Sequence, residues 1–133
     1  MLEVYSKNVT VAGGAQIPLN NESLVKGKTA VLQGAASIAL NRCGVYKVSV
    51  NANVTPGSAG TASIQMSKNG ALVENAVSQV TAEADTEYTL AFTALVQVPN
   101  NNTNCACTSP TVISFVNGLA GSVDLNVVID KVI

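Results

Sequence analysis

Three carboxylates at alternate positions, Glu83, Asp85 and Glu87, form the densest group of chemically active side chains in the sequence. Carboxylate oxygens are the ligands that Ca²⁺ prefers, so a calcium site is one interpretation of this group. The other interpretation is a solvated turn between two strands, kept in water by its charge. The second interpretation is favoured, and we expect no metal site and no cofactor.

Nucleophilic catalysis needs a base beside the nucleophile, and the chain contains no histidine. A Ser-His or Cys-His pair is therefore excluded. Two carboxylates could support glycan hydrolysis, but the acidic residues form no catalytic constellation. We predict that the protein is not an enzyme, and a glycan-active enzyme is the least favoured alternative.

The three cysteines, Cys43, Cys105 and Cys107, leave several interpretations open. An odd number argues against a simple disulfide framework, and no histidine is present to complete a metal site. Three reduced thiols are the favoured interpretation. A bridge from Cys43 to Cys105 or Cys107, an intersubunit bridge and a metal remain as alternatives.

The charge of the chain limits the classes of partner. The net charge is −1, and the seven basic residues are scattered along the sequence. A phosphate-binding surface needs clustered Lys and Arg, so we expect no nucleic-acid partner. No run of 18 apolar residues predicts a membrane span. The stretch from Met1 to Tyr5 lacks the pattern of a secretory signal, so we expect synthesis in the cytoplasm.

The longest candidate loop covers residues 100–110 and is rich in asparagine. Loops on a rigid scaffold often carry binding, and long loops are unusual without a function. A mobile polar loop is the alternative interpretation. The binding candidates in this loop are Asn100, Asn101, Asn102, Thr103 and Asn104.

The elements that would position these groups are β-strands. Along residues 44–55, apolar and polar side chains alternate, which predicts a strand with one buried face. Asn69-Gly70 separates two alternating runs and is a strong hairpin signal. Residues 20–23 read as a turn. The expected strands are 3–11, 29–33, 37–40, 44–55, 61–67, 71–80, 86–98, 111–116 and 122–133.

This pattern predicts one all-β domain over residues 1–133, an antiparallel sandwich or jelly roll of about eight to ten strands. Residues 1–18 are an edge segment or an anchor to another protein. Apolar strand faces are expected to form the core and part of an interface between subunits. The candidates for core and trimer contacts are Tyr46, Tyr88, Phe92, Phe115, Leu125, Val127 and Ile129.

The order of features resembles a known family. Gly44-Val45-Tyr46-Lys47-Val48 opens a long strand, a hairpin turns at Lys68-Asn69-Gly70, and a final strand runs to the last residue. This pattern is similar to the complement-globular-head and tumour-necrosis-factor-like family, particularly its bacterial and phage branch. The resemblance implies a ten-stranded jelly roll that assembles as a homotrimer, with one sheet packed around the threefold axis.

The resemblance also implies display, adhesion or structural decoration. The favoured expectation is a trimeric phage virion component, a head fibre or capsid decoration on the virion surface. Its partners would be a capsid or other virion protein and a cell-surface glycan bound through loops. The alternative is a bacterial surface or spore-coat adhesin module that binds carbohydrate or protein.

Overall fold

Ten β-strands, and no helix, make up the part of the chain that the structure describes. The structure is a computed structural model that describes residues 1–27, 29–99 and 106–133, with the backbone alone at 106–110. No helix that could cross a membrane occurs in these ranges. The strands are β1 (Leu2–Val11), β2 (Asn21–Val25), β3 (Ala30–Gln33), β4 (Ser37–Arg42), β5 (Gly44–Pro56), β6 (Gly60–Lys68), β7 (Ala71–Ala82), β8 (Tyr88–Val98), β9 (Ala106–Asn117) and β10 (Gly121–Lys131).

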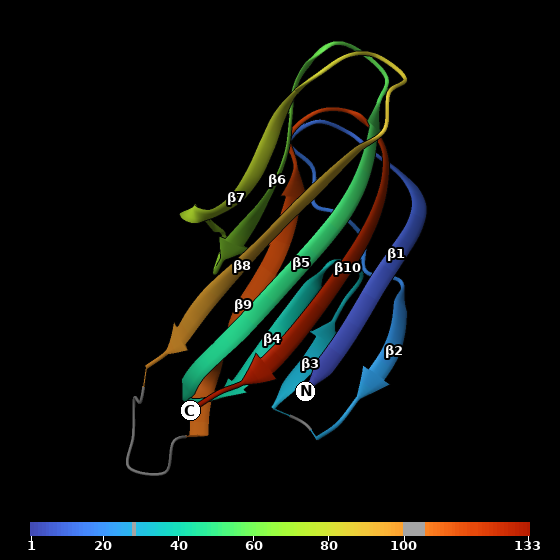
Figure 1. Ribbon diagram of the computed structural model, residues 1–133. Coiled ribbons are helices and arrows are strands. Elements are labelled where there is room, and N and C mark those ends of the chain that lie inside the picture. The colour runs from blue at the N-terminus through green and yellow to red at the C-terminus, as the bar shows by residue number, and fades with distance from the viewer. Residues whose placement is uncertain (28, 100–105) are drawn as a thin grey trace.

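The strands form two five-stranded sheets that pack face to face (Figure 1). The first sheet has the order β2-β1-β10-β5-β8, and the second has the order β3-β4-β9-β6-β7. Neighbouring strands are antiparallel in both sheets. The predicted all-β antiparallel jelly-roll sandwich is confirmed.

β5 shows why alternation predicts a strand. Its even-numbered side chains from Tyr46 to Val54 are all buried, whereas Lys47, Asn51 and Asn53 are exposed. The buried face packs on the core, and the polar face stays on the outside of the first sheet. β5 lies between β10 and β8 and pairs with both along most of its length, so it holds these two strands in one sheet.

The predicted hairpin joins β6 to β7. Asn69 and Gly70 have φ angles of 52° and 86°, the left-handed region that a two-residue hairpin turn requires. The turn is also tied to the neighbouring β9. The Asn69 backbone N–H donates to the Val112 carbonyl at 2.8 Å, and the Val112 N–H donates to Asn69 Oδ1 at 2.9 Å.

Two local predictions are wrong. Residues 20–23, predicted as a turn, belong mostly to β2, which pairs with β1. All five β2 residues are exposed, so this strand has no alternation for a sequence pattern to detect. Residues 106–110, predicted as loop, are the first residues of β9, where Ala106 pairs with Arg42. Backbone pairing to β4 overrides their loop-like composition.

The N-terminal residues are built into the sandwich. β1 lies between β2 and β10, and the following segment crosses to the second sheet. There the Ile17 N–H donates to the Phe115 carbonyl at 2.8 Å, and Leu19 donates to Ala35 at 2.7 Å. Ile17 and Leu19 are fully buried. An additional anchoring role for residues 1–18 stays a prediction.

A cluster of apolar side chains fills the space between the sheets. Tyr46, Phe115, Leu125, Val127 and Ile129 are each at most 1% exposed, so they lie inside a single subunit. The Tyr46 hydroxyl donates to the Arg42 carbonyl at 2.7 Å, which satisfies its polar atom. Tyr88 and Phe92 are partly buried and pack against the edge of this core.

Asn117 is a polar residue inside this apolar region, at 1% exposure. Its amide nitrogen donates to the carbonyls of Val11 and Leu119, at 3.1 and 2.8 Å. Its backbone N–H donates to Ala15, and its carbonyl accepts from Gly14. The side chain of Asn117 thus joins the end of β1 to the β9–β10 turn, and its backbone holds the crossing segment.

Cys43 is disulfide-bonded, so the expectation of three reduced thiols is wrong. The side chains of Cys105 and Cys107 lie outside the described residues. Disulfides persist in oxidising surroundings and are rare in the reducing cytoplasm of mesophiles.

Ser6 carries a buried hydroxyl without a hydrogen-bond partner among the described residues. An unsatisfied buried hydroxyl costs stability, so Ser6→Ala is expected to raise the free energy of unfolding by about 1 kcal/mol. Tm should rise by about 3 °C in a calorimetric scan. Ser49→Ala, on the half-buried outer side of β5, is the control and should change Tm little. A fall in Tm for Ser6→Ala would contradict this account.

Candidate functional site

The outward side of the first sheet aligns polar side chains from four strands. We call this surface the open face: the outward side chains of β1, β10, β5 and β8. Strand register places Tyr5 beside Asn126, Asn126 beside Asn51, and Asn51 beside Ala91. In the next row Asp124 lies beside Asn53, and Asn53 beside Thr89. Amides, a phenol and hydroxyls therefore form a continuous polar surface.

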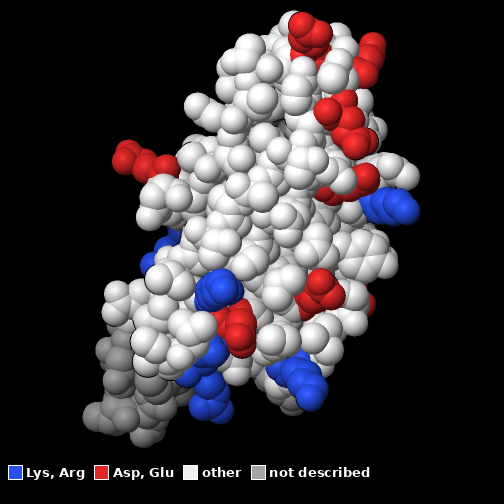
Figure 2. Space-filling model, in the orientation of Figure 1, with Lys and Arg blue, Asp and Glu red and all other residues white. Residues whose placement is uncertain are grey.

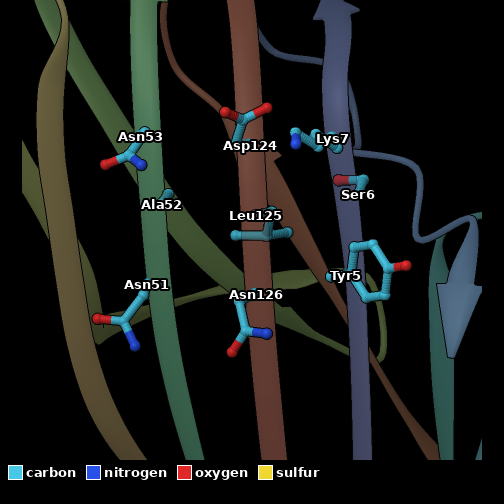
Figure 3. A pocket seen from close by; sticks show the side chains of 9 residues that line it. All are labelled: Tyr5, Ser6, Lys7, Asn51, Ala52, Asn53, Asp124, Leu125 and Asn126. Carbon is cyan, nitrogen blue, oxygen red and sulfur yellow. The ribbon is translucent and has the colours of Figure 1, made fainter. Parts of the chain in front are cut away.

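A shallow hollow of about 280 Å³ opens in the middle of this face. Figure 3 shows its polar lining, with Asn51 and Asn53 from β5, Asp124 and Asn126 from β10, and Tyr5 and Lys7 from β1. The buried residues Ser6, Ala52 and Leu125 complete it. The hollow has room for a small polar group or for side chains of another protein.

A β-bulge in β1 shapes one wall of the hollow. The register of β1 on β10 shifts between Ser6 and Val9, and Asn8 has a φ of 53°. The Asn8 backbone N–H donates to the Asp124 carboxylate at 2.5 Å. Asp124 thus satisfies a donor that the bulge removes from the strand ladder. Its role is structural support for the wall as well as surface charge.

Glu3 links three neighbouring strands below the hollow. The Ser23 hydroxyl of β2 donates to Glu3 Oε1 at 2.5 Å, and Asn126 Nδ2 of β10 donates to Oε2 at 3.3 Å. The hydrogen bond from Ser23, and to a smaller extent the one from Asn126, holds the pKa of the Glu3 carboxyl below its usual value. Both bonds favour the carboxylate because it accepts two donors.

This network makes the stability of the first sheet depend on pH. Folding lowers the pKa of this carboxyl, so the carboxylate stabilises the protein at pH values above the unfolded-state pKa of about 4.5. This contribution is lost as the pH falls below that value and toward the lower pKa of the folded state. We therefore expect the Tm of the wild type to exceed that of Glu3→Gln at pH 7. The difference should shrink as the pH drops from 5 to 3. A constant difference across this range would contradict a role for the carboxylate.

The β8 side of the open face is uncharged, whereas Asp124 and Lys7 line the hollow on the β10 and β1 side. Figure 2, which views this side of the molecule, shows a wide area without charge, with most acidic groups toward one end and most basic groups toward the other. Every outward residue of β8 is exposed and neutral: Thr89, Ala91, Thr93, Leu95 and Gln97. Leu95 is 70% exposed, a high value for a leucine.

β8 is also an edge strand of its sheet. Over its eleven residues it contains neither a charged residue nor a proline. Proteins commonly protect such edges with lysine, proline or a bulge, because an open edge pairs with other chains. Lys68 Nζ reaches the Gln97 carbonyl near the end of the strand. A long edge without a charge of its own beside an exposed leucine is typical of a surface that another chain covers.

The other predicted site residues fall elsewhere. Asn100, Asn101, Asn102, Thr103 and Asn104 lie outside the described residues. Glu83, Asp85 and Glu87 are exposed in the β7–β8 turn, where the Glu83 N–H donates to the Tyr88 hydroxyl. Residues 1–27, 29–99 and 106–133 contain no group of acidic, cysteine or histidine side chains that could hold a metal ion.

Sequence reasoning missed the hollow. Tyr5, Asn51 and Asn126 are far apart in the chain and lie on three different strands, β1, β5 and β10. The alternation indicated that they point outward, but the strand order that makes them neighbours has no local signal.

The fold has counterparts among solved structures. The globular domain of zebrafish complement 1qA matches with a TM-score of 0.75 and 6% identity, covering 99% of this chain and 96% of that chain. The fold is the complement-1q and tumour-necrosis-factor type of jelly roll. The Eiger tumour-necrosis factor from S. frugiperda matches with a TM-score of 0.72 and 12% identity, over 99% of this chain and 92% of that one.

A virus protein has the same jelly roll. The PRD1 vertex protein P5 matches with a TM-score of 0.63 and 16% identity, over 99% of this chain and 96% of that chain. No protein-family model and no curated protein matches the sequence. These identities establish the fold alone.

Proposed function

We propose that the protein is a structural display module, without enzymatic activity, that associates as a homotrimer through the open face. The observation that carries this proposal is β8, an edge strand that contains no charged residue, with neutral outward side chains and an exposed Leu95. In a cyclic trimer each subunit uses two different patches, one against each neighbour. The β8 edge of one subunit packs against the β1 and β10 side of the next, and the hollow receives its small side chains.

The host structure in this proposal is a phage particle, where the trimer is a head fibre or a capsid decoration. The jelly roll shared with the PRD1 vertex protein P5 over nearly the whole of both chains supports a virion component. The disulfide at Cys43 supports a location outside the reducing cytoplasm. A capsid or other virion protein is the proposed attachment partner.

A bacterial surface or spore-coat adhesin is the second candidate, and the hollow is the observation that favours it. Asn51, Asn126, Asp124 and the Tyr5 ring offer donors, acceptors and an apolar face, which suit a sugar. Trimer formation through the open face would cover this hollow. The two candidates therefore make opposite predictions for glycan binding at Asn51 and Asn126.

Light scattering on the purified protein, at low and high concentration, tests the proposed function. A mass near three times the 13.6 kDa subunit is expected at both concentrations. A monomer that binds glycans, and loses that binding on Asn51→Ala, would overturn the trimeric module in favour of the adhesin. Binding through residues 100–104 stays a prediction, tested by deleting them in the same glycan assay.

A further inference from the structure

The basic residues, scattered in the sequence, gather at one end of the sandwich. Five of the six basic residues in the described ranges lie there, and we call this region the basic end: Lys26, Arg42, Lys47, Lys68 and Lys131. Figure 2 shows most of the basic groups toward the lower end of the molecule and most of the acidic groups toward the upper end. Figure 1 shows that the lower end is also where both termini lie.

Hydrogen bonds and strand register establish this clustering. Lys47 lies at the margin of the open face, near the start of β5, where it pairs with Asp130 next to the pair of Tyr46 with Lys131. Arg42 ends β4, and its carbonyl accepts the Tyr46 hydroxyl. Lys68 Nζ donates to the Gln97 carbonyl near the end of β8, at 2.9 Å. Lys26 follows β2, and its N–H donates to the Met1 carbonyl at 2.9 Å.

The acidic side chains near this end only partly offset these cations. Within the described part of the chain none of the five forms an ion pair; Asp130, half-buried, lies beside Lys47, and Glu3 of β1 lies near Lys26. The end therefore has an excess of positive charge in a chain whose net charge is −1. A concentrated unpaired patch of one sign attracts and orients a partner of the other sign.

The surrounding side chains indicate what kind of partner fits. Val25 and Val132 are 46% and 48% exposed at the same end. Exposed aliphatic residues among cations are typical of a protein interface, with an apolar centre and a charged rim. Binding to a phosphate backbone relies on the cations alone and gains nothing from exposed valines.

We propose that the basic end is the docking surface for an acidic surface of a different protein. This inference rests on the proposed display function, since a display module must be held by something. With the threefold axis along the strands, three basic ends would share one base of the trimer. Their weak individual contacts would then add through multivalency. The acidic β7–β8 turns would point away from the attachment.

The test uses immobilised poly-L-glutamate as an acidic polypeptide probe, at low and at high ionic strength. The wild type is expected to bind at low salt and to lose most of its binding at high salt. Arg42→Gln with Lys131→Gln should weaken binding about tenfold. Asn75→Asp with Gln79→Glu is the matched control, because it shifts the net charge equally but on exposed positions of β7. The control should bind within twofold of the wild type.

Three outcomes would overturn the docking surface. They are no binding by the wild type, equal weakening by both double variants, and tighter binding to poly-deoxythymidine or anionic vesicles than to poly-L-glutamate at the same salt. The mass of each variant is measured in parallel. If the protein is a trimer but does not bind poly-L-glutamate, the docking surface is refuted and the proposed trimer is not. If the protein is a monomer that binds poly-L-glutamate, the proposed trimer is refuted and the docking surface is not.

Discussion

Replacing Leu95 by glutamate is expected to convert the proposed trimer into monomers. Leu95 is 70% exposed on the outward side of β8, where the proposed contact buries it in each of three interfaces. Burial of a leucine contributes about 2 kcal/mol, so three lost contacts raise the dissociation constant about ten-thousand-fold. Burying the new carboxylates adds a further penalty. Light scattering should show the mass falling to that of one 13.6 kDa subunit.

Leu72→Glu provides the matched control for this experiment. Leu72 is 56% exposed and lies on β7, the edge strand of the second sheet, so the same substitution is made on the other side of the sandwich. It should leave both the mass and the Tm of the trimer unchanged. Dissociation by Leu72→Glu, or a trimeric Leu95→Glu variant, would place the contact elsewhere than β8.

Asn117→Ala is expected to lower the free energy of unfolding by about 3 kcal/mol. The substitution leaves the carbonyls of Val11 and Leu119 buried without their donor and opens a cavity at a position that is 1% exposed. Tm should fall by about 10 °C. Urea unfolding followed by circular dichroism measures the change in free energy directly.

Asn117→Asp distinguishes the effect of losing the two hydrogen bonds from the effect of losing side-chain volume. Aspartate keeps the size of asparagine but presents an oxygen to two carbonyls, so the loss should be at least as large as for alanine. Asn53→Ala is the control, because Asn53 is exposed and accepts one hydrogen bond, from the Thr89 hydroxyl. A change below about 1 kcal/mol for Asn117→Asp would contradict the role of the amide as a donor.

The parts of the fold that the sequence predicted are those with local signals. Alternation of buried and exposed residues located β5 and β8, and the left-handed preference of Asn69-Gly70 located the β6–β7 hairpin. β2 was missed because all its residues are exposed and its strand character comes from pairing with β1. The burial of Asn117, just beyond the expected strand 111–116, was not predicted, since nothing local distinguishes a buried asparagine from a solvated one.

The candidate site was harder to predict from the sequence than the fold. Polar side chains on strands were predicted to face water, but their convergence depends on which strands are neighbours. Tyr5 and Asn126 meet because β10 inserts between β1 and β5. The charge pattern has the same origin: Arg42 and Lys131 are almost ninety positions apart, and both lie next to Tyr46. Such long-range neighbours follow from topology alone.

The central position of β10 in the first sheet has a consequence for biosynthesis. β10 is the last strand of the domain to leave the ribosome, yet it supplies the partner for both β1 and β5. Until β10 emerges, β1 and β5 each have one edge without a hydrogen-bonding partner, so folding on the ribosome cannot reach completion. A chain cut short before β10 would lack the middle of the first sheet, and β1 and β5 would each keep one unpaired edge.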